Sequence, residues 1–215
     1  MKKYDYIFFD LDGTITDPGE GITNSVAYAL KKFGIENTDR RELYPFIGPP
    51  LYASFMKYYG FSEEQAHTAV DYYREYYADK GIFENRLYDG VEELLDKLQK
   101  SGKKIILATS KPEIFAKKIL HHFDIDKYFN YIAGATLDSK RVEKADVIRY
   151  AFEQLGIDEG GSVMIGDRHF DITGAKQTGL VSAGVLWGYG DEDELQGAGA
   201  DFIAHTIADL KEFLI

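Results

Sequence analysis

The chain has 215 residues, of which 45% are hydrophobic and 28% charged, and its formal net charge is −11. These values are typical of a globular protein with one good-sized core, alone or with a small second domain. The acidic balance argues against general nucleic-acid binding, because that requires basic surface to displace counterions from phosphates. It is compatible with a small anionic substrate, since a bound cation can reverse the local potential.

The chain contains no cysteine, which excludes a cysteine-phosphatase mechanism, a cysteine zinc site and any disulfide. The apolar run after the charged N-terminus is too short for a signal peptide. No later segment approaches the roughly 18 apolar residues of a membrane span. We therefore expect a soluble, cytoplasmic protein that has no membrane partner.

Four short apolar runs predict β-strands. They cover residues 4–9, 105–108, 162–165 and 181–186. Each run ends at polar or glycine residues, which favour a turn. Continuous apolar runs of this length are typical of strands buried on both faces of a parallel sheet.

Helical patterns separate these runs. Apolar residues recur at i, i+3, i+4 and i+7 over 91–98 and 147–155, and a further helix is expected over 114–119, with Pro112 suited to its first turn. Alternation of strands and helices predicts a doubly wound, Rossmann-like α/β fold with right-handed crossovers.

The segment 16–86 holds no comparable strand-like run. It is typical of helices broken at glycine and proline, and nine of the sixteen tyrosines lie between Tyr44 and Tyr88. We interpret the tyrosines as core and surface filling, with a substrate-facing wall as the alternative. The predicted organisation is an α/β core of residues 1–15 and 87–215, with an all-helical insertion of residues 16–86 after the first strand.

Polar side chains follow three of the predicted strands. They are Asp10 and Asp12, Thr109 and Ser110, and Asp167 and Asp171. Because ligands of open α/β sheets bind outside the carboxyl ends of the strands, we expect these groups to converge. Carboxylate oxygens suit Mg²⁺, and a hydroxyl followed by backbone N–H groups at a helix start suits a phosphate. The sequence therefore predicts adjacent sites for a metal and a phosphoryl group.

These residues resemble the motifs of the haloacid dehalogenase (HAD) superfamily. Residues 10–14 match its DxDGT signature, Thr109 its second motif, Lys144 its third and 166–171 its GDxxxD motif. The insertion lies where subfamily I of these proteins carries a helical cap domain, and the pattern is most similar to the phosphoglycolate-phosphatase branch. The third motif here is Lys-Ala instead of the common Lys-Pro, so Lys140 stays an alternative to Lys144.

The resemblance implies a Mg²⁺-dependent phosphatase that forms an aspartyl-phosphate. Asp10 would be the nucleophile, and Asp12 the general acid and base, whose backbone carbonyl would also bind the metal. Thr109 and the backbone N–H of Ser110 would hold the phosphoryl oxygens. Lys144 would neutralise the charge that builds on those oxygens.

The fourth motif would complete the metal site through Asp167, beside Asp10. Asp171 would orient Lys144 or a metal-bound water, with a solvated helix-start carboxylate as the alternative. An acid at position 12 favours phosphate-ester hydrolysis, since a dehalogenase or a P-type ATPase lacks one there. His169 is expected to be an exposed helix residue.

The expected substrate is a small phosphorylated metabolite, such as a phosphoglycolate-like ester, a nucleotide or a sugar phosphate. A phosphomutase acting on a sugar phosphate stays open, because its chemistry before hydrolysis is the same. A non-catalytic binding module is the other alternative. No lysine or arginine lies between Thr16 and Leu30, so a strongly anionic leaving group would need a cation from elsewhere in the insertion, such as Arg40, Arg41, Lys57 or Arg86.

Overall fold

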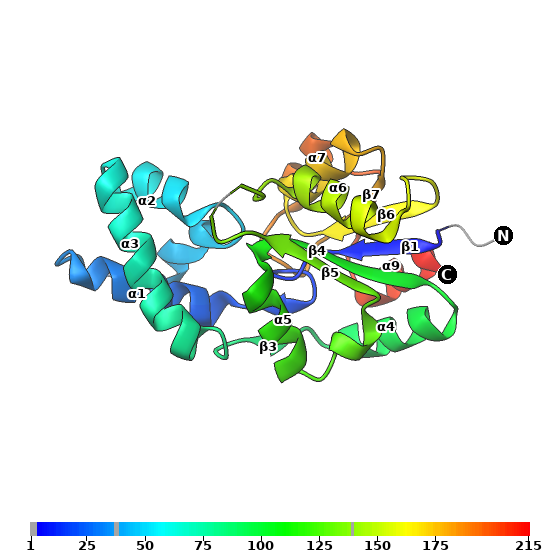
Figure 1. The fold of residues 1–215 in the computed structure, drawn as a ribbon, viewed down its shortest axis with the longest axis horizontal. Helices are drawn as coiled ribbons and strands as arrows, with labels where there is room; N and C mark the ends of the chain where they lie inside the picture. The colour runs from blue at the N-terminus through cyan, green and yellow to red at the C-terminus, as the bar shows by residue number, and fades with distance from the viewer. Residues whose placement is uncertain (1–3, 37–38, 139) are drawn as a thin grey trace. The chain divides into compact units, whose positions relative to one another are not determined.

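The computed structural model describes residues 4–36, 39–138 and 140–215, and the start of the chain with Lys2 and Lys3 lies outside this range. The chain divides into two compact units (Figure 1). One unit comprises Met1–Thr16 and Leu87–Ile215, and the other comprises Asp17–Arg86.

The first unit contains a six-stranded sheet in the order β5-β4-β1-β6-β7-β8. The strands are β1 (Tyr6–Phe9), β4 (Lys104–Pro112), β5 (Tyr131–Ala135), β6 (Ser162–Gly166), β7 (Val181–Val185) and β8 (Phe202–Ala204). Neighbouring strands pair in parallel throughout. This is the strand order of a doubly wound α/β fold, which confirms the predicted fold class.

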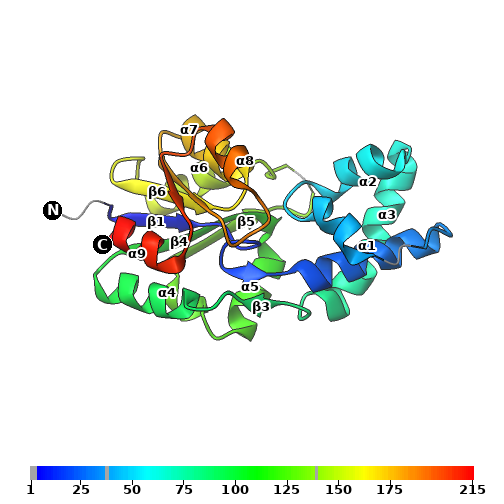
Figure 2. The same cartoon turned by 180° about the vertical axis from the view of Figure 1, so that it is seen from behind.

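Helices cover both faces of this sheet. They are α4 (Val91–Lys100), α5 (Glu113–His122), α6 (Lys144–Leu155), α7 (His169–Gln177), α8 (Glu192–Ala198) and α9 (Ile207–Leu214), with a short turn η3 (Asp126–Tyr128). Helices α6, α7 and α8 lie on one face and α4, α5 and α9 on the other (Figure 2). A sheet covered in this way explains why its central strands are apolar without alternation.

One hydrophobic core cluster forms where the central strands meet the α6–α7 layer. Phe8 of β1, Ile106 of β4 and Met164 of β6 are fully buried there. Val147 and Ile148 of α6 pack against them, as the helical spacing of their segment predicts. These apolar contacts fix the three strands whose ends carry the predicted site.

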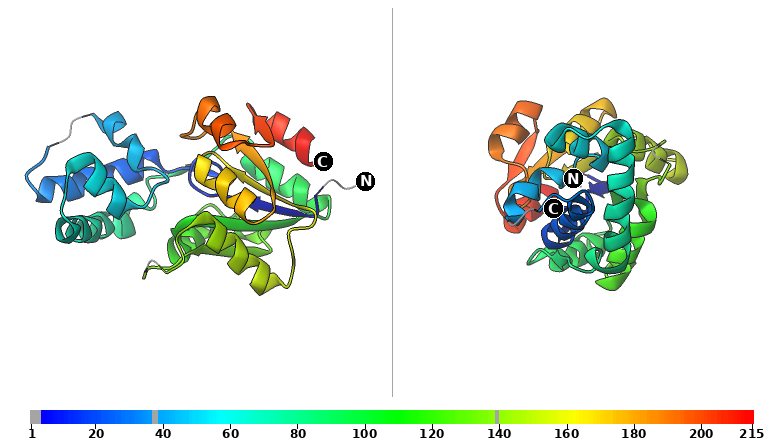
Figure 3. Two further views of the ribbon diagram at one scale, coloured as in Figure 1. Left: turned by 90° about the horizontal axis from the view of Figure 1, so that it is seen from above. Right: turned by 90° about the vertical axis from the view of Figure 1, so that its left-hand side faces the viewer.

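The second unit is helical. It contains α1 (Gly19–Lys32), η1 (Arg40–Phe46), α2 (Leu51–Tyr59), α3 (Glu63–Tyr76) and η2 (Tyr77–Gly81). Helix α3 packs against both α1 and α2 (Figure 3). The short strands β2 (Thr16–Asp17) and β3 (Arg86–Leu87) pair where the chain leaves and re-enters the first unit.

Aromatic side chains make up much of the second unit's interior. Phe55 stacks on Phe61 with ring centroids 5.8 Å apart, and Tyr73 stacks on Tyr77 at 5.2 Å. Tyr58, in contrast, has 43% of its surface exposed. This distribution fits the interpretation of the aromatic residues as core and surface filling.

The two-residue strands β2 and β3 were not predicted, nor were two strands of the six-stranded sheet, and one strand is longer than predicted. The missed strands β5 and β8 are the edges of the sheet, where a short or glycine-containing segment carries little apolar signal. Strand β4 continues beyond residue 108 to Pro112, with a register shift between Thr109 and Pro112. Thr109 and Ser110 therefore lie inside β4, because its pairing with β5 extends the strand to Pro112. In the described part of the chain, no helix is long and apolar enough to span a membrane.

Candidate active site

Three adjacent strands bring the predicted site residues to one edge of the sheet. Strand β1 lies between β4 and β6, and Phe9 is in register with Leu107 on one side and Ile165 on the other. Asp10 follows β1, Thr109 lies in the carboxyl-terminal half of β4, and Asp167 follows β6. These residues come together because β4, β1 and β6 are neighbours in the sheet, although they are far apart in the sequence.

Two loops enclose Asp167. Gly13 has φ = 80°, and a Cβ atom added there would lie 2.0 Å from the Oδ2 atom of Asp167, so only glycine fits at this position. On the other side, the backbone N–H of Tyr189 donates to the same Oδ2 atom over 2.8 Å. Trp187 Nε1 donates to the carbonyl of Thr14 over 3.1 Å. The loop after β7 is therefore bound both to Asp167 and to the loop after β1.

Lys144 is buried at the start of α6, with its side chain 3% exposed. Its Nζ atom lies 2.8 Å from Oδ1 of Asp10 and 2.8 Å from Oδ1 of Asp171, and it donates to the carbonyl of Ala108 over 2.9 Å. Burial disfavours the charged ammonium, but Asp10 and Asp171 outweigh it and raise the pKa of Lys144 to about 12. Lys140 is 85% exposed and pairs with Asp138, so Lys144 is the lysine that lies at the site.

Asp10, Asp167 and Asp171 form a cluster whose candidate ligand atoms all lie within 4.8 Å of one another. Burial, followed by repulsion from Asp171 and Asp10, raises the pKa of Asp167 well above its usual range. Burial also raises the pKa of Asp171, to about 6, against the effect of Lys144. The Oδ1 atom of Asp167 is buried without a hydrogen-bond partner among the described residues.

This carboxylate cluster fits a divalent cation. Buried carboxylates without enough positive charge repel one another, and an oxygen without a hydrogen bond is suited to a metal ligand. Asp171 is already engaged, because its Oδ1 pairs with Lys144 and its Oδ2 accepts from the backbone N–H of Arg168 over 3.1 Å. Asp171 therefore contacts Lys144, and the role of orienting that lysine stays a prediction.

Asp12 belongs to a separate ion pair with Lys111. The Nζ atom of Lys111 lies 2.6 Å from Oδ2 of Asp12, and the side chains are 6% and 13% exposed. Burial raises the pKa of Asp12, and Lys111 opposes that shift. Sequence reasoning assigned no role to Lys111. Its position two residues after Thr109, on the strand that pairs with β1, could have indicated that Lys111 lies near Asp12.

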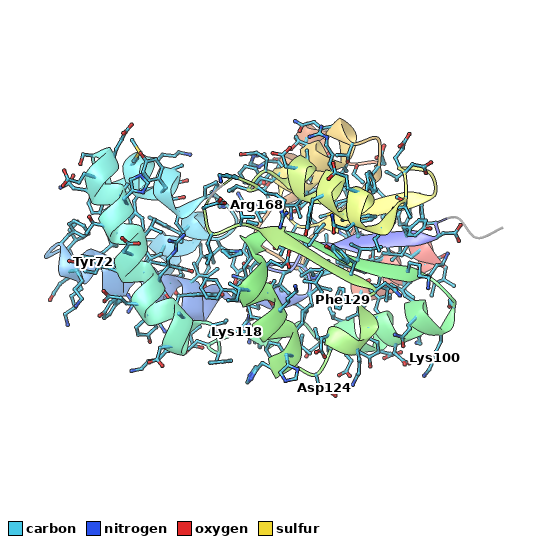
Figure 4. The ribbon with its side chains drawn as sticks, in the orientation of Figure 1. Tyr72, Lys100, Lys118, Asp124, Phe129 and Arg168 are labelled. Carbon is cyan, nitrogen blue, oxygen red and sulfur yellow. The ribbon has the colours of Figure 1, made fainter. Side chains whose placement is uncertain are left out.

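Glu194 of α8 holds the start of α7. Its Oε1 atom accepts from Nε of Arg168 over 2.9 Å and from the backbone N–H of His169 over 2.8 Å, and it contacts Nδ1 of His169 at 2.7 Å. His169 is 42% exposed, so it is a half-exposed helix residue and is bound to Glu194. Arg168 lies near the carboxyl ends of the strands (Figure 4). Sequence reasoning missed Glu194, which lies far along the chain from the motif it supports.

The fold is a doubly wound α/β fold. At the carboxyl ends of its strands it holds a cluster of carboxylates with a buried lysine. The chain belongs to the haloacid dehalogenase-like hydrolase family, whose model matches residues 7–185. This match confirms the family that the sequence motifs predicted.

Known proteins similar to this chain carry names of phosphoryl-group enzymes. The 5′-nucleotidase of Pseudomonas aeruginosa is 44% identical over 212 residues, which cover 99% of this chain and 96% of that protein. The tyrosine-protein kinase PtkA of Mycobacterium tuberculosis is 37% identical over 210 residues, which cover 97% of this chain and 72% of that protein. The crystal structure of a predicted phosphatase from Clostridium acetobutylicum is 50% identical, with a TM-score of 0.94 and coverage of 98% of this chain and 97% of that one. The family and two of these names support the predicted enzyme class, a phosphoric monoester hydrolase.

Proposed function

We propose that this chain is a Mg²⁺-dependent phosphatase that hydrolyses a small phosphate monoester through an aspartyl-phosphate at Asp10. One observation carries the proposal: Lys144 Nζ lies 2.8 Å from both Asp10 and Asp171, beside the buried carboxylate cluster. A permanently charged lysine next to a carboxylate at a strand end can neutralise a phosphoryl group and leave the carboxylate ionised for attack.

The side chains of Asp10 and Asp167, with the backbone carbonyl of Asp12, would hold the Mg²⁺ ion. The unpartnered Oδ1 atom of Asp167 supports this assignment. When bound, the ion neutralises charge on the phosphoryl oxygens. Asp171 would act by holding Lys144, since its Oδ1 lies 2.8 Å from Lys144 Nζ and its Oδ2 accepts from the backbone N–H of Arg168.

The reaction would proceed in two steps on this chain's own residues. A carboxylate oxygen of Asp10 attacks phosphorus as the bond from phosphorus to the leaving oxygen breaks, and Asp12 gives that oxygen a proton. Water then attacks phosphorus, Asp12 takes a proton from it, and the bond between Asp10 and phosphorus breaks. Inorganic phosphate leaves, and both aspartates return to their starting forms.

Thr109 and Ser110 would bind the transferring phosphoryl group. Thr109 is 2% exposed, and its Oγ1 atom accepts from the backbone N–H of Lys111 over 3.2 Å, which leaves its hydroxyl proton to be donated. Ser110 follows at the same end of β4 and is half-buried. Its backbone N–H is the proposed second donor to the phosphoryl oxygens.

The leaving group would be selected by the second unit, residues 17–86, acting as a cap. A cap of this kind excludes water from the reacting groups and limits which leaving group fits. A 5′-nucleotide is the leading candidate because of the similarity to the nucleotidase of Pseudomonas aeruginosa. Phosphoglycolate and sugar phosphates are the other candidates within the monoester class.

Phosphate release from a panel of nucleotides, phosphoglycolate and sugar phosphates tests the proposal. Release should require Mg²⁺, stop on addition of EDTA and resume when Mg²⁺ is restored in excess. The Asp10→Asn variant should release no phosphate above background. Full activity of that variant, or release that is indifferent to EDTA, would contradict the proposal.

A further inference from the structure

The site contains a second buried lysine, Lys111, to which the proposed chemistry assigns no role. Lys144 contacts Asp10 and Asp171, whereas Lys111 contacts Asp12. The side chain of Lys111 is 6% exposed, and its Nζ atom lies 2.6 Å from Oδ2 of Asp12. A buried ion pair is costly to form, so its position beside the site requires an explanation.

The backbone around Lys111 is shaped to present this side chain. The pairing of β4 with β5 shifts register between Thr109 and Pro112. Within this irregular stretch, the hydroxyl of Thr109 accepts from the backbone N–H of Lys111 over 3.2 Å. On β5, a Cβ atom at Gly134 would lie 2.8 Å from the carbonyl oxygen of Lys111, so glycine is needed for this path of the strand.

The two oxygens of Asp12 are in different environments. Oδ2 is paired with Lys111, whereas Oδ1 is buried and has no hydrogen-bond partner in residues 4–36, 39–138 and 140–215. Rotation of the carboxyl group would break the ion pair with Lys111. The contact therefore fixes which oxygen of Asp12 is available for another group.

We propose that Lys111 is a positioning residue that anchors Oδ2 of Asp12 and so leaves Oδ1 to exchange the proton with the leaving group. This inference rests on the proposed function, in which Asp12 is the general acid. In the acid form of Asp12 the proton is on Oδ1 while Oδ2 still accepts from Lys111. This proton passes to the leaving oxygen as the bond of that oxygen to phosphorus breaks and the bond from Asp10 to phosphorus forms. Lys111 neither gains nor loses a proton in this step.

The inference predicts that loss of Lys111 lowers kcat/KM most for substrates whose leaving group needs a proton. An alkoxide is a poor leaving group and depends on the general acid, whereas p-nitrophenolate leaves without one. The ratio of kcat/KM for an alkyl phosphate to kcat/KM for p-nitrophenyl phosphate therefore measures the positioning of Asp12. Because kcat/KM reports the steps up to phosphoenzyme formation, the later hydrolysis does not affect this ratio.

Lys111→Met removes the charge and keeps the length of the side chain. We expect it to lower kcat/KM for glycerol phosphate about 100-fold and that for p-nitrophenyl phosphate less than about threefold. Lys111→Arg keeps a cation and should restore most of the ratio. Lys100→Met is the matched control, since Lys100 is 74% exposed and pairs with Asp96 on the surface of α4. An equal loss on both substrates, or no loss on either, would overturn the inference.

A double-mutant cycle with Asp12→Asn tests whether Lys111 acts through Asp12. If it does, Lys111→Met should change kcat/KM for glycerol phosphate less than about threefold in the Asp12→Asn background. A further loss of tenfold or more there would contradict the inference. The double variant removes both charges of the Asp12–Lys111 pair, so it gives an answer if Lys111→Met alone does not fold.

Failure of this inference differs from failure of the proposed function. If the wild-type protein releases no phosphate, or does so without Asp10, the proposed function is wrong. If the wild-type protein behaves as proposed and the substrate ratio does not respond to Lys111→Met, only the role of Lys111 is wrong.

Discussion

Lys144 illustrates how a single residue acquires a role from its surroundings. Its ammonium is buried between two carboxylates and a backbone carbonyl, and its pKa is raised to about 12 although burial alone would lower it. It therefore stays charged at neutral pH. A fixed positive charge beside Asp10 is what phosphoryl transfer requires.

The Lys144→Met variant should lose about 100- to 1,000-fold in kcat, the usual effect of removing one group that stabilises transition-state charge. Lys140→Met should change kcat less than about twofold, because that side chain is exposed and lies at Asp138. Steady-state phosphate release with both variants checks this. The reverse ranking would assign the role to Lys140.

The sequence motifs predicted residues that the structure brings together, but not the contacts that hold them. Asp10, Asp167 and Asp171 do form one cluster, and Lys144 lies against it. The contact of Lys111 with Asp12 was not predicted, because it depends on the pairing of β4 beside β1. The charge and spacing of residues within one segment do not show which side chains of another strand lie beside it.

At the scale of elements, helix α8 supports the loop that carries Asp167. Glu194 accepts from Arg168 and from the backbone of His169, and these bonds connect α8 to the start of α7. Burial would raise the pKa of Glu194, but the bonds from His169 and Arg168 outweigh it and lower the pKa. The charged form of Glu194 therefore stabilises the folded protein.

Glu194→Gln should lower the free energy of unfolding by about 1.5–3 kcal/mol at pH 7, the contribution of hydrogen bonds to a charged group. Because the folded pKa is depressed, the stabilisation is present above the unfolded carboxyl pKa of about 4.3 and is lost as the pH falls below it. Urea unfolding of both proteins at pH 7 and pH 3.5 measures the difference. Asp193→Asn, at an exposed neighbouring position, is the control. A difference that is the same at both pH values would contradict the role of the charge.

The central elements were predictable and the edges of the sheet were not. β1, β4, β6 and β7 are apolar because they are buried on both faces, and α4 and α6 show a clear apolar stripe. β8 has three residues and β5 contains Gly134, so neither carries a strong strand pattern. These two strands form because a neighbouring strand pairs with them, and the sequence of one segment does not show its neighbour in the sheet.

At the scale of the whole molecule, the fold accumulates negative charge at one place. The net charge is −11, and three carboxylates share one buried edge of the sheet with one lysine among them. Such a cluster is unfavourable in the free protein and is relieved by a dication. The stability of the molecule should therefore depend on the metal.

Saturating Mg²⁺ should raise the melting temperature, since a ligand at 100 times its Kd stabilises the folded state by about 2.7 kcal/mol. Asp167→Asn should melt at a higher temperature than the wild type in EDTA, because one repelling charge is gone, and should respond less to Mg²⁺. Thermal unfolding followed by circular dichroism checks both expectations. An equal response of both proteins to Mg²⁺ would exclude Asp167 as a ligand.

The most direct test of the account is to detect the phosphoenzyme. The protein is mixed with a substrate found in the panel and Mg²⁺, quenched in acid within milliseconds, and digested for mass spectrometry. We predict one added phosphoryl group on the peptide that contains Asp10, and none in the Asp10→Asn variant. Phosphate release at a normal rate with no phosphorylated peptide, or with the phosphoryl group on another residue, would contradict the account.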